Sequence, residues 1–447
     1  MGYNEGWPGG PYGSAYYDGT YIQVNDFGYE ASPMALDIAV LQAKYGPNAS
    51  HASGDTTYLL PSTNRLGAYY ESIWDTGGID EIRSESSQNA LIDLRMATLQ
   101  GEIGGGGYVS YVSGIRGGYT VAAGVVIENA TGGRGNDTII GNEAANLLLG
   151  REGNDSISAG SGADTLLGGL GEDNLLGDVG KDFLDGDEDA DDLDGGGGDD
   201  TLYGGDGDDE LAGGSDNDRL IGGEGNDTLN GDAGNDVLID RYGALNTLNG
   251  GAGEDRIVTS SGADFVTGGS DRDVIKTFGG ADVIYGDEGN DVILSGTEND
   301  TVYGGDGDDV IKTSLGDDYV EGGDGNDTIY TWRGNDTAIG GAGDDTIRGD
   351  FDDDTIEGGA GNDRLIGAPG RDTFIFREGF EEDRILDFWD GSDLLDFSQH
   401  TGVDSYDDLS ISQVSSHVVI TDGLGGRVVL ADTDIANISE ADFVFVA

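Results

Sequence analysis

Hydrophobic residues recur at intervals of nine along much of this chain, separated by glycines and acids. The segment GGDGDDVIK, residues 304–312, has the typical form, with Asp at its sixth position and Ile at its eighth. Twelve such nonapeptides run without a break from Gly132 to Ile239, and fourteen more run from Gly250 to Ile375. One ten-residue unit, DRYGALNTLN, lies between the two runs. A fixed period of this kind predicts a repeat architecture rather than several globular domains.

Two positions of the nonapeptide scarcely vary along the chain. The sixth is Asp in every nonapeptide except one, which has Asn146, and the eighth is Ile, Leu, Val or Phe except at Ala338. The net charge alone would favour a disordered chain. A disordered acidic segment, however, has no reason to hold two positions so strictly. We therefore predict an ordered structure.

The nonapeptide divides into a six-residue loop and a three-residue strand. The eighth side chain points inward and its two neighbours point outward, as the period of two in a strand requires. After Gly250 the loops alternate between two kinds, so the full repeat has eighteen residues: strand, turn, strand, turn. One strand cannot bury its apolar side chain alone, so successive units must stack. The pattern predicts an all-β fold, a two-sided parallel β-roll with its loops in two columns.

Stacked loops bring like charges together. Position-six carboxylates of one column would lie about 5 Å apart, one strand spacing. Each like-charged neighbour costs about 1 kcal/mol in water and more at lower dielectric. Carboxylates and glycine carbonyls are hard oxygen ligands, which favour Ca²⁺, with Mg²⁺ as second choice. We therefore expect folding and calcium binding to be a single event.

Composition narrows the range of partners. The 447 residues include 88 acids and 21 bases, a formal charge of −67, which disfavours nucleic acid as a partner. Cysteine is absent, so neither disulfides nor thiolate metal sites are expected. The sequence has no run of about 18 apolar residues, so no membrane span is expected. The N-terminal segment MGYNEGWPGGPYGS has neither the basic nor the apolar region of a cleavable signal peptide.

The repeat GGxGxDxUx is identified as the calcium-binding RTX repeat, and the resemblance covers residues 132–375. It implies an RTX β-roll in which each ion takes position-six Asp carboxylates and loop carbonyls from units two apart in sequence. Applied to this chain, Asp309 would act with Asp291 and Asp327. The carboxylate ligands that the resemblance implies are Asp137, Asp155, Asp164, Asp173, Asp182, Asp200, Asp209, Asp218, Asp227, Asp236, Asp255, Asp273, Asp291, Asp309, Asp327, Asp345 and Asp363. The carbonyl ligands expected in four representative loops are those of Gly204, Gly205, Gly207, Gly304, Gly305, Gly307, Gly322, Gly323, Gly325, Gly340, Gly341 and Gly343.

Several loops depart from this pattern. Asn146 is expected to weaken its site, and Asn246 lies in the irregular ten-residue unit. Loops that begin with Thr or Ser instead of Gly are expected to hold calcium less firmly, because a β-branched residue disfavours positive φ. They begin at Thr259, Thr277, Ser295, Thr313 and Thr331, and they contain Asp264, Asp282, Asp300, Asp318 and Asp336. A simple extension of the strands by these Thr residues is the alternative interpretation.

The segments before the roll resemble the C-terminal part of serralysin-type zinc proteases from about Ala35 onward. PMALDIAVLQAKYG, residues 33–46, is predicted to be a helix with Ser32 as its cap. YESIWDTGGIDEI follows, and then GVVIENATGGRGNDTIIGNEAAN. The resemblance implies four regions, which are a remnant of a metzincin-like protease domain over residues 1–46, an N-terminal cap over 47–131, the roll over 132–375 and a C-terminal cap over 376–447.

The catalytic zinc helix of that family, H-E-x-x-H-x-x-G-x-x-H, is not found in this sequence. The histidines are His51, His400 and His417, far apart and without a Glu at the spacing that zinc hydrolysis requires. Met1 and Tyr3 fit the Met-turn pattern, which implies Tyr3 as a vestigial zinc residue. We therefore expect this chain not to be an enzyme, and Zn²⁺ only if a catalytic domain exists upstream.

The last residues, ISEADFVFVA, resemble the uncleaved C-terminal signal of type I secretion, in which acids precede a short apolar tail. A capping strand is the alternative interpretation of this segment, and the two are compatible. The sequence thus predicts an extracellular calcium-binding module, exported without an N-terminal signal, with the type I exporter as partner. Two alternatives stay open: the C-terminal part of an active zinc protease, or a structural or adhesive surface protein.

Overall fold

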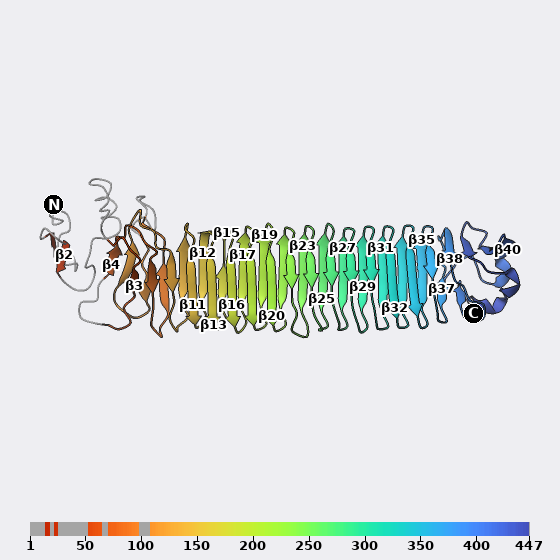
Figure 1. Cartoon of the computed structure of the whole chain (residues 1–447), viewed down its shortest axis with the longest axis horizontal. Coiled ribbons are helices and arrows are strands. Elements are labelled where there is room, and N and C mark those ends of the chain that lie inside the picture. The colour runs from red at the N-terminus through yellow and green to blue at the C-terminus, as the bar shows by residue number, and fades with distance from the viewer. Residues whose placement is uncertain (1–13, 18–21, 26–51, 65–69, 98–107, 447) are drawn as a thin grey trace. The chain divides into compact units, whose positions relative to one another are not determined.

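The computed structural model describes residues 14–17, 22–25, 52–64, 70–97 and 108–446, in two compact units, Met1–Asp218 and Arg219–Ala447. Nearly all regular structure in these residues is β-strand (Figure 1). The helical elements of the described residues are three short 3₁₀ turns, η1 (Tyr406–Asp408), η2 (Ile435–Asn437) and η3 (Glu440–Asp442). The all-β prediction is confirmed, whereas the helix expected over residues 33–46 and the Met1–Tyr3 pair lie outside the described residues.

In the first unit, two parallel ladders carry the repeats. The first ladder consists, in order, of β3 (Thr57–Leu59), β5 (Glu81–Arg83), β9 (Asn129–Thr131), β11 (Leu147–Glu152), β13 (Thr165–Leu170), β16 (Phe183–Glu188) and β18 (Thr201–Asp206). The second consists of β6 (Ala90–Asp93), β10 (Thr138–Asn142), β12 (Ser156–Gly162), β14 (Asn174–Leu176) with β15 (Val179–Gly180), β17 (Asp192–Gly197) and β19 (Glu210–Ser215). Both ladders thus begin before Gly132, where the strict period starts.

Five further strands of the first unit lie outside these ladders or at their edge. β1 (Ser14–Tyr17) and β2 (Ile22–Asn25) form an antiparallel pair. β4 (Tyr70–Ile73) pairs in parallel with β8 (Gly118–Val121), and β7 (Tyr111–Val112) adds to β6 in antiparallel fashion. The antiparallel strand β7 therefore covers the edge of β6 within this unit.

The second unit is built in the same way. One ladder consists of β20 (Arg219–Glu224), β22 (Val237–Ile239), β24 (Arg256–Val258), β26 (Val274–Lys276), β28 (Val292–Leu294), β30 (Val310–Lys312), β32 (Thr328–Arg333), β34 (Thr346–Phe351), β36 (Arg364–Ile366) and β38 (Glu382–Ile385). The other consists of β21 (Thr228–Ala233), β23 (Thr247–Ala252), β25 (Phe265–Ser270), β27 (Val283–Glu288), β29 (Thr301–Asp306), β31 (Tyr319–Asp324), β33 (Thr337–Ala342), β35 (Thr355–Ala360), β37 (Thr373–Ile375) and β39 (Leu394–Asp396).

The register within each unit confirms the eighteen-residue coil. Ile139 pairs with Ile157 in the first unit, and Ile293 pairs with Ile311 in the second. The ten-residue unit shifts the pairing once, so that Thr228 lies opposite Thr247, nineteen residues later. The extra residue is accommodated in the loop before Thr247, and the strands on either side keep their register.

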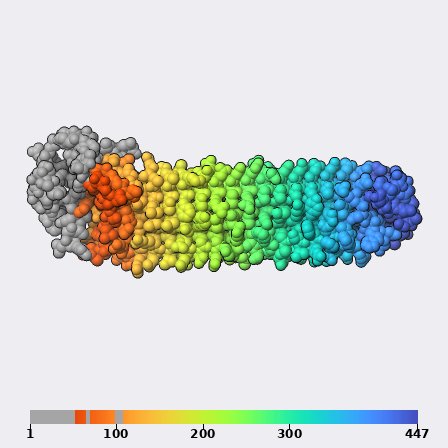
Figure 2. Space-filling model, viewed as in Figure 1, coloured from red at the N-terminus to blue at the C-terminus, as the bar shows by residue number. Residues whose placement is uncertain are grey.

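Rows of position-eight side chains form the core of each coil. Ile275, Ile293 and Ile311 are fully buried, and even the small Ala338 is only 1% exposed. The flanking residues of each strand alternate outward, as the buried–intermediate pattern of β28 shows. On the face drawn in Figure 2, successive coils of each unit pack directly against one another. Each nonapeptide therefore contributes one row of apolar contacts to the core.

The last residues of the second unit cover the end of its ladders. β42 (Arg427–Leu430) pairs in parallel with β38. On its other side β42 pairs antiparallel with β41 (His417–Thr421), which pairs antiparallel with β40 (Ser410–Val414). β43 (Phe443–Val444) pairs in parallel with β39. The rings of Phe376, Phe380 and Phe397 lie beneath these strands, with centroids 5.1 Å and 5.2 Å from that of Phe376. The C-terminal tail is thus a strand of the folded chain.

Candidate metal sites

The position-six Asp residues form buried columns in each unit. In the second unit we name the two columns by their loops. The glycine column contains Asp236, Asp255, Asp273, Asp291, Asp309, Asp327, Asp345 and Asp363, and the threonine column contains Asp227, Asp264, Asp282, Asp300, Asp318, Asp336, Asp354 and Asp372. The columns of the first unit are Asp137, Asp155, Asp173, Asp191 and Asp209, and Asn146 followed by Asp164, Asp182, Asp200 and Asp218. Every one of these Asp residues is at most 3% exposed.

One oxygen of each carboxylate joins a ladder of hydrogen bonds. The Oδ1 atom of Asp309 accepts the backbone N–H of Asp291 at 2.8 Å. The backbone N–H of Asp309 in turn donates to Oδ1 of Asp327 at 2.8 Å. The structure therefore links the three acids that the RTX resemblance groups in one ladder, with each acid one coil from the next.

The other oxygen of most column acids lacks a hydrogen-bond partner. Among the described residues, no donor reaches the buried Oδ2 atoms of Asp155, Asp164, Asp173, Asp182, Asp191, Asp200, Asp255, Asp264, Asp273, Asp282, Asp291, Asp300, Asp309, Asp318, Asp327, Asp336, Asp345, Asp354, Asp363 and Asp372. None of these carboxylates takes part in an ion pair with a described Lys, Arg or His. A buried carboxylate oxygen without a partner has a high free energy, which a bound cation would lower.

The first glycine of each loop leaves room for oxygen atoms. A Cβ atom on Gly304 would collide with Oδ2 of Asp309 and with the carbonyl oxygen of Gly322. The carboxylate of one loop and a carbonyl of the next therefore face the same α-carbon. Gly304 does not have a positive φ, so the predicted reason for glycine at position one is wrong. The reason is the space that the oxygens occupy.

Glycine at positions two and four does meet a conformational need. Gly305 has φ of 115° and Gly307 has φ of 135°, values that favour glycine over residues with a side chain. The carbonyl oxygens of Asp287 and Gly289, in the preceding coil, point at the α-carbons of these two glycines. The loops thus present backbone oxygens along the column, next to the acids.

Five loops of the threonine column have Thr or Ser at position one, where the glycine column has Gly. The strands β24, β26, β28 and β30 end before Thr259, Thr277, Ser295 and Thr313, and only β32 continues through Thr331. The alternative that these residues simply extend the strands is therefore wrong at four of the five loops. Instead, the hydroxyl of Thr313 donates to the carbonyl of Thr331 at 2.9 Å, and that of Thr331 to Gly349 at 3.0 Å.

These hydroxyls compete with a cation for the same oxygens. The position-one carbonyl of Thr331 already accepts the Thr313 hydroxyl, which engages one of its two lone pairs. Burial raises the pKa of Asp318, and the hydrogen bond from the Asp300 backbone N–H lowers it in part. The threonine column thus has hydroxyl donors to position-one carbonyls at Thr313 and Thr331, where the glycine column has only glycine, which gives a physical reason for weaker cation binding at these loops.

The buried acids of the glycine column hold protons more tightly than ordinary Asp. Burial, followed by the charges of Asp291 and Asp327, raises the pKa of Asp309 to about 7. Burial likewise raises the pKa of Asp291 to about 6 and that of Asp345 to about 8. Desolvation is the main cause in each case, and the neighbouring column acids add to it.

The available ligands fit Ca²⁺ better than they fit a transition metal. The described residues contain no group of three or more His, Cys, Asp or Glu side chains arranged to hold a metal ion. A cation in a column would therefore have two carboxylates at most and would need backbone carbonyls or water for the rest. Such an all-oxygen set is typical of Ca²⁺, which tolerates irregular geometry better than Mg²⁺ does.

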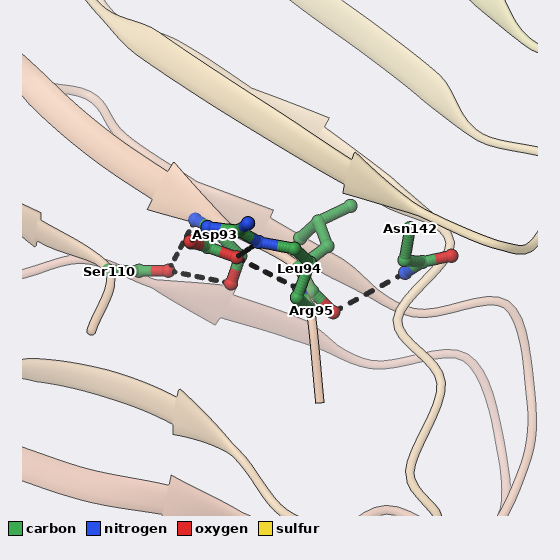
Figure 3. Close-up of polar contacts among 5 residues, drawn as sticks. All are labelled: Asp93, Leu94, Arg95, Ser110 and Asn142. Carbon is green, nitrogen blue, oxygen red and sulfur yellow. Dashed lines mark hydrogen bonds and ion pairs between the residues drawn. The ribbon is translucent and has the colours of Figure 1, made fainter. Parts of the chain in front are cut away.

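Asp93, at the end of β6, shows how a buried acid is stabilised without a metal ion. Its side chain is 2% exposed, like those of the columns. The guanidinium of Arg95 donates to both of its oxygens, at 2.9 Å and 2.6 Å (Figure 3). The backbone N–H of Asp93 donates to the hydroxyl of Ser110 at 2.9 Å. No such cationic side chain accompanies the column acids whose Oδ2 atoms are unpartnered.

Two residues at the start of the columns in the first unit differ from the rest. Both oxygens of Asp137 accept backbone N–H groups, from Ala90 and from Gly133, each at 2.5 Å. Asn146 accepts the N–H of Asn142 at 2.9 Å, and its amide donates to the carbonyl of Glu128 at 2.8 Å. Neither residue has a vacant oxygen for a cation, so Asp137 is a weaker candidate than the resemblance implied.

Five column acids were missed by the list of expected ligands. Asp191, Asp354 and Asp372 occupy position six of regular repeats and have the same geometry as their neighbours. Asp383 and Asp393 extend the two columns beyond the repeats, and they accept the N–H groups of Asp363 and Asp372 at 3.1 Å and 3.2 Å. Asp383 follows Asp363 by 20 residues and Asp393 follows Asp372 by 21, so neither fits the strict eighteen-residue repeat. The pattern Asp-x-Ile or Asp-x-Leu would have revealed them.

Comparison with known proteins identifies the repeats. The family model for the RTX calcium-binding nonapeptide repeat matches more than half of the chain. The matched residues are 131–166, 167–202, 203–238, 244–275, 279–302, 303–338 and 339–374. The described residues contain no helix long and apolar enough to cross a membrane.

The curated relatives include a metallopeptidase and a serralysin, each matched over part of its length. Metallopeptidase AprA of Pseudomonas marginalis is 40% identical over 129 residues, which is 27% of this chain and 25% of that protein. Serralysin of Photorhabdus laumondii is 39% identical over 128 residues, 26% of this chain and 25% of that protein. The alignment with each relative thus spans about a quarter of the relative's length.

A solved structure also shares a likeness with this chain. It is a hyperactive, Ca²⁺-dependent, β-helical antifreeze protein from an Antarctic bacterium, 20% identical, with a TM-score of 0.27. The match covers 76% of this chain and 85% of that one. A TM-score this low supports no conclusion about function.

The two columns of the second unit should differ in their need for calcium. Asp309→Ala removes a carboxylate from the glycine column, where Oδ2 has no protein donor. Losing a ligand worth about 1.4 kcal/mol weakens a site about tenfold, so we expect the calcium midpoint of folding to rise. Asp318→Ala should raise it less, because in its loop the Thr313 hydroxyl already donates to a position-one carbonyl that would otherwise face a cation. Calcium titrations followed by circular dichroism measure both midpoints. Equal shifts, or a larger shift for Asp318→Ala, would show that the first residue of the loop is irrelevant.

Acid should partly replace calcium. The pKa values of about 6 to 8 for Asp291, Asp309 and Asp345 lie above the value of about 3.9 for an unfolded Asp. The stability that protonation gives the metal-free fold is thus complete below about pH 4 and is lost as the pH rises through 6 to 8. In EDTA, we expect β-structure to increase when the pH falls from about 8.5 to about 5. Circular dichroism in saturating calcium, which should change little over this range, is the control; a flat profile in EDTA would contradict the prediction.

Proposed function

The chain belongs to the family of RTX calcium-binding nonapeptide-repeat proteins, and we propose that its repeats form a secreted module that folds when it binds calcium. The column acids carry this proposal: buried carboxylates with unpartnered Oδ2 atoms, stacked one coil apart. Without a cation, the folded state buries many like charges. Extracellular calcium modules typically bind at about 10⁻⁴ to 10⁻³ M, so the chain would stay unfolded in a cytosol with little free calcium and fold outside.

The C-terminal tail supports export before folding. Phe443 is 8% exposed in β43, and its ring stacks on that of Phe445, with centroids 5.9 Å apart. The buried Asp442 accepts the N–H of Ser439 at 2.7 Å. A tail held in this way is accessible to an exporter only while the chain is unfolded. We propose that the tail is the type I export signal first and a capping strand afterwards.

We assign no catalytic step to the roll. Its column acids are buried, so a substrate could not reach them. The metallopeptidase activity named for the curated relatives belongs to proteins of which this chain matches about a quarter. The role proposed for the repeats is therefore to couple the fold to external calcium.

Calcium should switch the chain between two states. In EDTA at about pH 8, we expect a far-ultraviolet circular dichroism spectrum of a largely unfolded chain, because the column acids are ionised and unpaired. Addition of millimolar Ca²⁺ should produce the spectrum of a β-protein. Mg²⁺ at the same concentration is the matched control and should produce little change. Identical spectra in EDTA and in calcium would refute the proposed function.

Export should depend on the last six residues. Deletion of residues 442–447 removes both the signal and β43, and we expect the protein to remain inside cells that carry a type I exporter. Secreted and intracellular protein, measured by immunoblot, gives the export fraction.

A second variant separates the signal from the cap. Phe397→Ala removes a buried ring that packs against Phe443, at 6.3 Å between centroids, and leaves the tail sequence intact. We expect this variant to be exported as well as the parent. If the deletion variant is exported as well as the parent, the tail is only a capping strand. If both variants lose export equally, the defect arises from misfolding and not from loss of a signal.

A further inference from the structure

The loop of the ten-residue unit contains a buried acid that no nonapeptide supplies. Asp240 occupies the first position of the unit, where the other loops of its column have Gly, Thr or Ser. Its side chain is 0% exposed. Its Oδ1 accepts the N–H of Tyr242 at 3.2 Å, and its Oδ2 has no hydrogen-bond partner among the described residues. A fully buried and unpartnered oxygen of this kind points to a missing ligand.

The unpartnered oxygen faces a second carboxylate. A Cβ atom on Gly222 would meet both Oδ2 of Asp227 and Oδ2 of Asp240, so the two oxygens lie against the same α-carbon. Burial, and then the charge of Asp227, raises the pKa of Asp240. Two ionised carboxylates cannot donate to one another, so a positive partner is required between them.

Asn246 explains why the acid is needed at this position. It takes the place of the position-six Asp in this loop, and its amide is fully engaged. Its Oδ1 accepts the N–H of Asp227 at 3.2 Å, and its Nδ2 donates to the carbonyl of Tyr242 at 2.8 Å. Asn246 therefore brings no charge to the column. Asp240 restores it, because the loop keeps one carboxylate but carries it at position one instead of position six.

We propose that Asp227 and Asp240 form a calcium site of their own, in which Oδ2 of each residue binds the ion and backbone carbonyls or water complete the shell. The site differs from those of the regular loops because a side chain at position one, rather than at position six, supplies the second carboxylate. Two carboxylates with further oxygens are a suitable set for Ca²⁺. The inference rests on the proposed calcium binding of the repeats and names one more site within it.

Crystals of the whole calcium-loaded chain test the site directly. Anomalous difference maps at a wavelength where calcium scatters anomalously locate each ion. We expect a peak between Oδ2 of Asp227 and Oδ2 of Asp240, together with peaks in the glycine column, for example between Asp291 and Asp309. Peaks in the glycine column without one at Asp240 would overturn the inference and leave the proposed function standing. A map with no calcium peak would overturn both.

Two variants sharpen the test. Asp240→Asn keeps the acceptor for the Tyr242 N–H but removes the charge, and we expect the peak at Asp240 to disappear while the glycine-column peaks remain. Asp232→Asn, in the preceding loop, removes the same charge from an exposed side chain and should lose no peak. A peak that persists in Asp240→Asn would show that the Asp240 carboxylate does not bind the ion. If Asp240→Asn fails to fold, the map of the parent protein alone decides.

Discussion

The burial of like-charged carboxylates in rows is the constraint on which this structure depends. Each acid in the middle of a column has a neighbour of the same charge one coil away on either side. The hydrogen-bond ladder that links Asp291, Asp309 and Asp327 satisfies Oδ1 and leaves Oδ2 without a donor. At an effective dielectric near 20, each such repulsion reaches several kcal/mol. The folded roll therefore requires positive charge in its columns, supplied either by protons or by the calcium ions that we propose.

The hydrophobic core is too small to offset the repulsion between the buried carboxylates. Each nonapeptide buries one row of Ile, Leu or Val side chains, such as Ile293 and Ile311, and the rest of the unit is loop. Ordering nine residues costs conformational entropy that a single buried side chain does not offset. Each added coil adds the same unfavourable conformational entropy and also adds further buried carboxylates. A cation bound in every coil would offset this cost once per coil. The acid and the apolar position would then have to recur with the same period, as they do.

Periodicity made the fold predictable, and departures from it hid part of the site. The constant positions six and eight predicted the buried Asp columns and the Ile rows, because one period fixes both. The same strictness concealed Asp383 and Asp393, whose spacing differs by a few residues. The role of Gly304 was also misjudged, since only coordinates reveal that Oδ2 of Asp309 occupies the space of a side chain. Asp240 could not be recognised from a repeat pattern, because it serves the column from a different loop position.

The ends of the columns differ in chemistry from their middle. In the first unit, Asp137 receives two backbone N–H groups and Asn146 has lost its charge. In the second unit, Asp393 accepts the N–H of Asp372 on Oδ1 and that of Trp389 on Oδ2 at 2.8 Å. An end acid has a neighbour on one side only, so it could not share a cation as the middle acids can. Backbone donors at Asp137 and Asp393, and the uncharged amide of Asn146, let these column ends stop without an unbalanced buried charge.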